Sequence, residues 1–240
     1  MRLLMTCMEC LTESGQPNEH FSSEFRDDSR YEHTCSKGHK TTTVLQQQRF
    51  EILFEIGAHA ILDGYYRESV SSFTSSLERF YEFAIRVFLD NPSCPDTLVQ
   101  DCWKLVSRQS ERQLGAFIVL WAAAFRTTPD LLSNKDVEFR NEVIHKGTIP
   151  TKERAIKYGE AVLTVLRTKI LAIQTKFPNE VRRAILSHLS GNRTDSDKDK
   201  TVATHGLRTI VSLMVAEPSH HSKSLEEHLA ELLVRRSGLF

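Results

Sequence analysis

The sequence predicts a mainly α-helical protein with a small N-terminal region of short β-strands and a helical C-terminal tail. Two observations lead to this prediction. From residue 45 onward, apolar side chains recur at the three- and four-residue spacing of amphipathic helices, with few breaks. Before that point, paired cysteine and histidine residues stand among polar and β-branched ones. We therefore expect three parts, which comprise residues 1–44, 45–190 and 191–240.

The composition indicates the cellular compartment of the protein and argues against one class of partner. The 240 residues carry a formal net charge of +0 with 26% charged residues, so the chain lacks the overall basic excess of a non-specific DNA-binding protein. Five cysteines, two of them in a C-x2-C pair, favour metal binding in a reducing cytoplasm over a disulfide framework. No run of 18 or more apolar residues occurs, and the N-terminus lacks the apolar region of a signal peptide. We expect a cytoplasmic protein with no membrane partner.

Four residues near the N-terminus have the spacing of a metal site. Cys7 and Cys10 form a C-x2-C pair, and Cys35 and His39 form a C-x3-H pair after a long polar loop. A tetrahedral Zn²⁺ ion takes two ligands from each of two such tight turns. Because the protein supplies all four ligands, we expect a structural zinc and no catalytic metal. His33 is a second candidate for the fourth ligand.

The segments beside these pairs predict short strands. Residues 2–5, 30–34 and 40–44 are rich in β-branched and aromatic side chains. Together with the ligand spacing and the C-x-x-G-H ending, the N-terminal part resembles a zinc ribbon.

From residue 45 the apolar spacing predicts a succession of helices. The apolar run over 117–124 is too short to cross a bilayer and predicts a buried core helix. Residues 190–204, rich in glycine, asparagine, serine and aspartate, predict a linker. The expected helices, including two amphipathic pieces in the tail, are 45–62, 66–89, 97–108, 111–126, 134–146, 151–177, 179–189, 207–215 and 225–234.

The segment 139–147 (FRNEVIHKG) is the strongest candidate for a site of chemistry. Gly147 is suited to follow a helix end, which places His145 in the last turn, where the negative end of the helix favours imidazolium. Asn141 lies four residues before His145, on the same helix face. Arg140 lies five before it, about 140° around the helix axis, so Arg140 and His145 point apart. A histidine that exchanges protons near neutral pH and an arginine fork that binds phosphate suit phosphodiester chemistry without a metal.

These residues resemble the R-x4-H motif of the HEPN family, in which a polar residue usually follows the arginine. The H-K-G turn and the long helix after it are also similar to the family's pattern. The resemblance covers about residues 45–189 and implies an up-and-down helical bundle. It also implies a metal-independent ribonuclease that works as a homodimer, with two motifs in one cleft. The catalytic residues would be Arg140, Asn141 and His145.

A second R-x4-H match in the chain serves as a decoy. Arg183 and His188 have the same spacing, but alanine follows the arginine and no H-K-G turn follows the histidine. Glu78 and Glu82 are polar positions beside the apolar stripe of the second long helix. They either line the cleft or form an ordinary solvated face.

Two classes of function follow. The first is an endonuclease that cleaves single-stranded RNA through its 2′-hydroxyl and acts as a toxin or anti-phage effector, with an antitoxin or phage protein as a further partner. The second is a catalytically silent HEPN module that binds RNA, nucleotide or a protein, with the zinc ribbon as docking surface. An intact arginine, amide and histidine favour the first.

Overall fold

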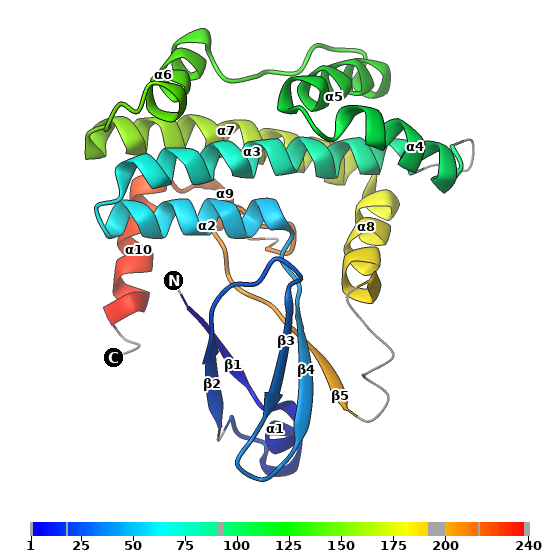
Figure 1. Cartoon of the computed structure of the whole chain (residues 1–240), viewed down its shortest axis with the longest axis vertical. Helices are drawn as coiled ribbons and strands as arrows, with labels where there is room; N and C mark the ends of the chain where they lie inside the picture. Colours follow the sequence, from blue (N-terminus) through cyan, green and yellow to red (C-terminus); the bar gives the residue numbers. More distant parts are fainter. Residues whose placement is uncertain (1, 18, 91–93, 192–199, 216, 238–240) are drawn as a thin grey trace. The chain divides into compact units, whose positions relative to one another are not determined.

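The computed structural model of the chain describes residues 2–17, 19–90, 94–191, 200–215 and 217–237. Within these residues the protein is mainly helical, with ten helices and five short strands (Figure 1). Backbone contacts divide the chain into two compact units. The strand unit comprises Met1–Gln48 and Ile185–Arg208, and the helical unit comprises Arg49–Ala184 and Thr209–Phe240.

The strand unit contains two small sheets. Strand β1 pairs antiparallel with β2, so that Leu3 lies opposite Ser23. In the other sheet β4 lies in the centre, antiparallel to β3 and parallel to β5. The sequence of β4, KTTTVL, is β-branched at four of its positions and buried from Thr41 onward, as expected of a central strand. The elements of this unit are β1 (Leu3–Thr6), α1 (Met8–Ser14), β2 (His20–Ser23), β3 (Arg30–Thr34), β4 (Lys40–Leu45) and β5 (Thr201–His205).

The N-terminal part is a small region of short strands, as expected. The structure adds three elements that were not expected: α1, β2 and β5. The strands expected at 2–5, 30–34 and 40–44 correspond to β1, β3 and β4. The sequence did not indicate α1 or β2. The linker predicted over 190–204 is wrong at its end, where Thr201–His205 forms β5 and pairs with β4; residues 192–199 lie outside the described residues.

Helix α3 is the centre of the helical unit. It packs against α2, α5, α6 and α7 (Figure 1), and its buried stripe follows the predicted spacing of three and four residues. Phe73 and Phe80 of this stripe are fully buried. The helices of this unit are α2 (Arg49–Leu62), α3 (Tyr66–Leu89), α4 (Asp96–Val106), α5 (Ser110–Phe125), α6 (Asn134–His145), α7 (Lys152–Lys176), α9 (Pro218–Ser222) and α10 (Leu225–Ser237); α8 (Pro178–Gly191) begins in this unit and ends in the other.

The expectation for α5 is only partly right. The helix forms where predicted, but of its apolar residues only Phe117 and Trp121 are buried; the third buried side chain, Gln113, is polar. Among the described residues, no helix combines the length and the apolar content needed to cross a bilayer.

The C-terminal segment is part of the helical core. The helix predicted over 207–215 is wrong, because no helix forms there; Ile210 and Leu213 are nevertheless buried. Their backbone N–H groups donate to buried carboxylates of α2, Ile210 to Glu55 at 3.0 Å and Leu213 to Glu51 at 2.9 Å. Buried backbone donors outside helices and sheets need such partners. The helix predicted over 225–234 is confirmed as α10.

The two compact units group the chain differently from the expected ranges 1–44, 45–190 and 191–240. The strand β5 joins the first unit, and the segment after residue 208 joins the second.

Candidate metal centre and candidate catalytic residues

The four predicted metal ligands come together in the strand unit. The ligand atoms of Cys7, Cys10, Cys35 and His39 all lie within 4.8 Å of one another. The Sγ atoms of Cys10 and Cys35 are 3.8 Å apart, and His39 Nδ1 lies 3.5 Å from Cys10 Sγ and 3.9 Å from Cys7 Sγ. Tetrahedral zinc with bonds of about 2.3 Å to sulfur and about 2.0 Å to nitrogen separates its ligand atoms by about 3.6–3.8 Å. The group therefore has the size to hold one tetrahedral metal ion.

Two short turns position these ligands. Cys7 immediately precedes α1 and Cys10 lies in its first turn, whereas Cys35 and His39 lie in the connection between β3 and β4. Gly38 closes that connection with a φ of 86° and donates its N–H to the carbonyl of Cys35 at 2.9 Å. Glycine adopts this left-handed conformation without steric cost.

The imidazole of His39 has a second contact on its far side. While Nδ1 faces the thiols, Nε2 lies 3.3 Å from Glu13 Oε1 and 3.7 Å from Glu9 Oε2, both carboxylates of α1. Metal-binding histidines usually present their other ring nitrogen to such an acceptor, which fixes the tautomer. Sequence spacing did not point to either carboxylate. Glu13 is offset by three from Cys10, so the same helix turn that supplies a ligand could have suggested it.

The alternative ligand, His33, is not among the clustered atoms. Its ring stacks on Phe21 with the ring centroids 3.9 Å apart, and its Nε2 lies 3.9 Å from Glu19 Oε1. Of the two histidines considered for the fourth position, the structure places only His39 in the group.

The thiols are poorly disposed to ionise together without a cation. Burial and the neighbouring thiols of Cys7 and Cys35 raise the pKa of Cys10 to about 12. Burial alone would raise the pKa of Cys7 too, but hydrogen bonds from the Cys10 backbone, Thr41 and His39 lower it to about 7. A bound divalent ion would offset the mutual repulsion of several thiolates. With four protein donors, the group leaves no position of a tetrahedral ion open to substrate.

The candidate catalytic residues lie on α6, which forms over Asn134–His145 where residues 134–146 were expected. The Ser133 hydroxyl accepts a hydrogen bond from the N–H of Asp136 at the N-terminus, and His145 is the last helical residue. Gly147 follows with a φ of 72°. The buried side chains of Phe139 and Val143 hold the helix against the core.

Arg140 and His145 have different surroundings. One guanidinium nitrogen of Arg140 donates to Asn141 Oδ1 at 2.9 Å, and another lies 3.8 Å from Glu78 Oε1 on α3. The side chain of Arg140 is 25% exposed. His145 is exposed, and its imidazole forms no hydrogen bond or ion pair within the described part of the chain. The two side chains thus do not meet within one chain, as their spacing predicted.

The side chains of Asn141 and Glu82 both contact arginines. The amide oxygen of Asn141 accepts from Arg140, and among the described residues no hydrogen bond joins the side chains of Asn141 and His145. Glu82 is bound by Arg79 and Arg86 of its own helix, both at 2.9 Å, and its side chain is 17% exposed. Glu78 is the acidic residue that faces Arg140.

Both residues of the decoy pair are occupied by local contacts. Arg183 donates to Asp90 and to Glu180, each at 2.8 Å. His188 Nε2 lies 3.0 Å from the carbonyl oxygen of Leu45. These partners account for both side chains without a catalytic role.

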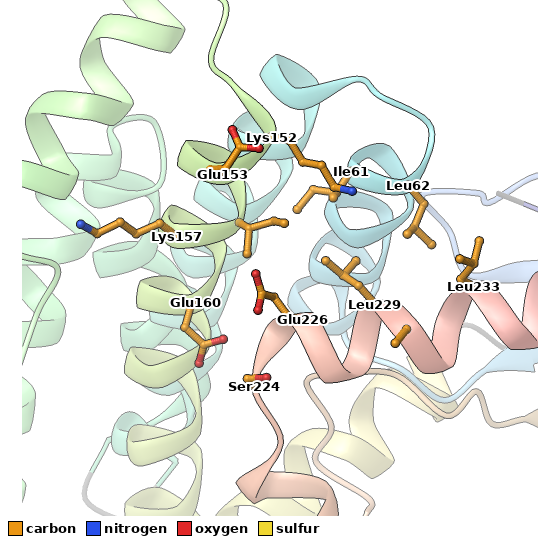
Figure 2. A pocket seen from close by; sticks show the side chains of 12 residues that line it. Ile61, Leu62, Lys152, Glu153, Lys157, Glu160, Ser224, Glu226, Leu229 and Leu233 are labelled. Carbon is orange, nitrogen blue, oxygen red and sulfur yellow. The ribbon is translucent and has the colours of Figure 1, made fainter.

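A groove of about 720 Å³ lies elsewhere in the helical unit, between α2, α7 and α10 (Figure 2). Ile61, Ile156 and Leu229 contribute apolar surface to it, and Lys152 and Glu226 contribute charge. Neither Arg140 nor His145 lines this groove. The sequence did not indicate it, because its walls come from three helices that are far apart in the chain. Charges of both signs give it no preference for one class of ligand.

The comparisons with known proteins do not assign the chain to a family. No protein-family model matches it, and no curated protein and no solved structure matches it at a significant level. The fold and the two candidate sites therefore rest on the residues described above.

Proposed function

We propose that the chain is a metal-independent endoribonuclease of the HEPN type, with Arg140, Asn141 and His145 as its catalytic residues. The observation that supports this proposal best is the contrast on α6: an exposed imidazole without a partner in the described chain, and an arginine held by Asn141 and Glu78. The first group is free to exchange a proton. The second is oriented in advance to bind a phosphate, which lowers the entropic cost of binding.

In the proposed reaction, His145 takes the proton of the 2′-hydroxyl of the RNA. The 2′-oxygen then forms a bond to the adjacent phosphorus, and the bond from phosphorus to the 5′-oxygen breaks. The 5′-oxygen receives a proton from an imidazolium, so charges and protons balance. The guanidinium of Arg140 stabilises the negative charge that develops on the phosphoryl oxygens. The products are a 2′,3′-cyclic phosphate and a 5′-hydroxyl.

We further propose that the substrate is single-stranded RNA and that the active form is a homodimer. An A-form duplex holds the 2′-oxygen out of line with the leaving group, whereas a single strand or loop can adopt the in-line geometry. Because Arg140 and His145 point apart on one helix, a composite centre takes the two groups from different copies.

The decisive experiment is cleavage of RNA in the presence of EDTA, with the chemical ends of the products determined. Wild-type protein should cleave without added divalent ions and leave cyclic phosphate ends, and His145→Ala should lose about 10²-fold or more in rate. Arg140→Lys should also lose most activity, because a point charge cannot copy the guanidinium fork.

The decoy pair provides the control for this experiment. Arg183→Ala and His188→Ala replace an arginine and a histidine that have the same spacing as Arg140 and His145. Both variants should retain near wild-type cleavage. Cleavage that requires magnesium, leaves 5′-phosphate ends and survives His145→Ala would contradict the proposed residues and the proposed chemistry.

We also propose that the Cys7, Cys10, Cys35 and His39 group binds one structural Zn²⁺ and that the strand unit is a zinc ribbon. The distances among the four ligand atoms support this proposal. Elemental analysis should find about one zinc per chain in the wild type and none in Cys35→Ala. A metal-free wild-type protein with a well-folded N-terminal region would contradict it.

The alternative proposal is a catalytically silent module that binds RNA, nucleotide or a protein partner. Expression of the protein discriminates the two: a toxin or anti-phage nuclease should slow growth of the host cell, and its His145→Ala form should not. Equal growth with both forms, together with RNA binding that survives His145→Ala, would favour the binding module.

A further inference from the structure

Helix α7 buries a lysine whose ammonium group has no acceptor. Lys169 is only 2% exposed, yet its side chain forms no hydrogen bond or ion pair within the described residues. Its Nζ atom lies over the ring of Trp121 on α5, 5.4 Å from the ring centroid. Such a cation–π contact compensates only in part for the loss of water around a charge. A buried charge normally has an oppositely charged partner or several hydrogen bonds.

The indole of the same tryptophan is a second buried donor without an acceptor. Trp121 is 7% exposed, and its Nε1 atom is buried with no hydrogen-bond partner in the described part of the chain. Buried indole N–H groups usually have such a partner. Since the ammonium group of Lys169 lies over this ring, the two donors belong to one small region between α5 and α7.

A second lysine of α7 makes a similar ring contact but has an acceptor. Lys176 follows Lys169 by seven residues, or two helical turns, and its Nζ atom lies 5.0 Å from the ring centroid of Phe125. This side chain is exposed, and it donates to the carbonyl of Ala124 near the end of α5. Of the two lysines, the buried one is therefore the one that lacks an acceptor among the described residues.

The nearest negative charge does not pair with Lys169. Burial lowers the pKa of Lys169, and the carboxylate of Asp130 offsets only part of this shift. Asp130 is an exposed residue of the connection between α5 and α6, and no ion pair joins it to Lys169 in the structure. The described chain thus places a cation and an N–H donor in its interior and supplies no acceptor to either.

We propose that Lys169 and Trp121 form a binding site for the carboxylate group of a small molecule. Two donors without an acceptor favour a ligand with two acceptor oxygens, one for the ammonium group and one for the indole N–H. The single negative charge of a carboxylate matches the single positive charge of Lys169, and a charge-assisted hydrogen bond is stronger than a neutral one. A phosphate dianion would bring a second negative charge close to Asp130. The inference does not rest on the proposed nuclease activity, because binding is measured without RNA.

Tryptophan fluorescence tests the site directly. The chain has two tryptophans, so Trp103→Phe leaves Trp121 as the single indole. Titration of this variant with sodium acetate should change its emission saturably, whereas sodium chloride at the same ionic strength should not. Adding Lys169→Met should abolish the change, because the ammonium group is lost while a long side chain is kept. Adding Lys176→Met instead is the matched control and should leave the response unchanged.

Thermal unfolding provides a second measurement that does not depend on the indole. Acetate should raise the unfolding midpoint of the wild type relative to chloride, since a ligand that binds the folded state stabilises it. Lys169→Met should show no such rise. In chloride this variant should be at least as stable as the wild type, because it removes a buried charge that has no partner.

The charge of Asp130 distinguishes the proposed site from one built on the α5–α6 connection. Asp130→Asn should bind acetate about twofold more tightly, since it removes a nearby like charge. Equal responses to acetate and chloride, or an acetate response that survives Lys169→Met, would overturn the inference. Loss of the response in Asp130→Asn would overturn it too, because the site would then depend on Asp130 and not on the two buried donors.

Discussion

Two histidines of the helical unit show how the surroundings of one residue determine its chemistry. His145 at the end of α6 is exposed, and its imidazole has no partner among the described residues. His228 of α10 is only 1% exposed, and its Nε2 lies 2.7 Å from a guanidinium nitrogen of Arg167. Because arginine can only donate, this imidazole must be neutral and accept. Burial first, and then the charge of Arg167, lower the pKa of His228 to about 4.

The pH dependence of stability should report on His228. The unfolded chain protonates this histidine near pH 6.5, but the folded chain does so only near pH 4. The unfolded state therefore binds more protons in this window, and the free energy of unfolding should fall as the pH is lowered from about 6.5 to 4. The loss from this group should be on the order of 2 kcal/mol. Urea unfolding at several pH values would measure it.

The variant His228→Gln should reduce this dependence, since glutamine keeps an acceptor for Arg167 and does not titrate. His59, whose pKa burial also lowers to about 4, contributes with the same sign, so part of the dependence should remain. Thr168→Ala, at an exposed position of α7 without a titratable side chain, is the control and should leave the profile unchanged. An identical profile for wild type and His228→Gln would mean that Arg167 does not hold a neutral imidazole.

At the level of elements, helices α2 and α7 approach Phe73 of α3 very closely. Gly57 of α2 and Gly159 of α7 both face its ring, and a Cβ atom at these positions would come within 2.7 and 2.6 Å of it. At Gly159 the same atom would also lie 2.6 Å from a methyl group of Leu225, at the start of α10. The absence of two side chains thus lets α2 and α7 pack on one aromatic residue of α3.

Gly159→Ala should therefore destabilise the protein although alanine is the better helix former. Overpacking a buried site costs about 1–3 kcal/mol, which exceeds the roughly 1 kcal/mol gained in helix propensity. The midpoint of urea unfolding should fall. Thr168→Ala, on the exposed side of the same helix, should change stability by less than about 0.5 kcal/mol. A Gly159→Ala protein more stable than the wild type would show that the ring of Phe73 can move away.

The elements that the sequence predicted well are those with local signals. The long apolar stripe of α3 and the Gly147 end of α6 depend on neighbours within one or two helical turns. The segment 207–215 has a similar apolar pattern but is not helical, because Glu51 and Glu55 of α2 satisfy its backbone donors. Such partners lie more than 150 residues away in the sequence, so no local pattern could reveal them.

The same distinction applies to the whole molecule and to its candidate sites. The Cys7, Cys10, Cys35 and His39 group could be predicted because two short turns each provide two ligands. The divergence of Arg140 and His145 followed from helix geometry alone. In contrast, the parallel pairing of β5 with β4 joins Ala203 to Thr43, and residues 49–184 of the helical unit lie between them in the sequence. The segment before β5 is rich in turn-forming residues.

This pairing predicts how loss of the proposed metal would spread through the strand unit. The sheet joins β5 to the β3–β4 connection that carries Cys35 and His39, and the Thr201 hydroxyl also donates to Glu9, which lies next to His39. If the bound metal stabilises the strand unit, Cys35→Ala should accelerate amide hydrogen exchange in residues 2–48 and also in 201–205. Residues 210–213, only a few positions further along, donate to α2 and should keep their protection, as should α3.

Hydrogen exchange followed by mass spectrometry resolves these peptides, and Cys102→Ala, an exposed cysteine outside the group, is the control. Unchanged exchange in 201–205 while 2–48 unfolds would show that β5 does not depend on the metal-binding turns, and faster exchange in α3 would show that the two units do not unfold separately.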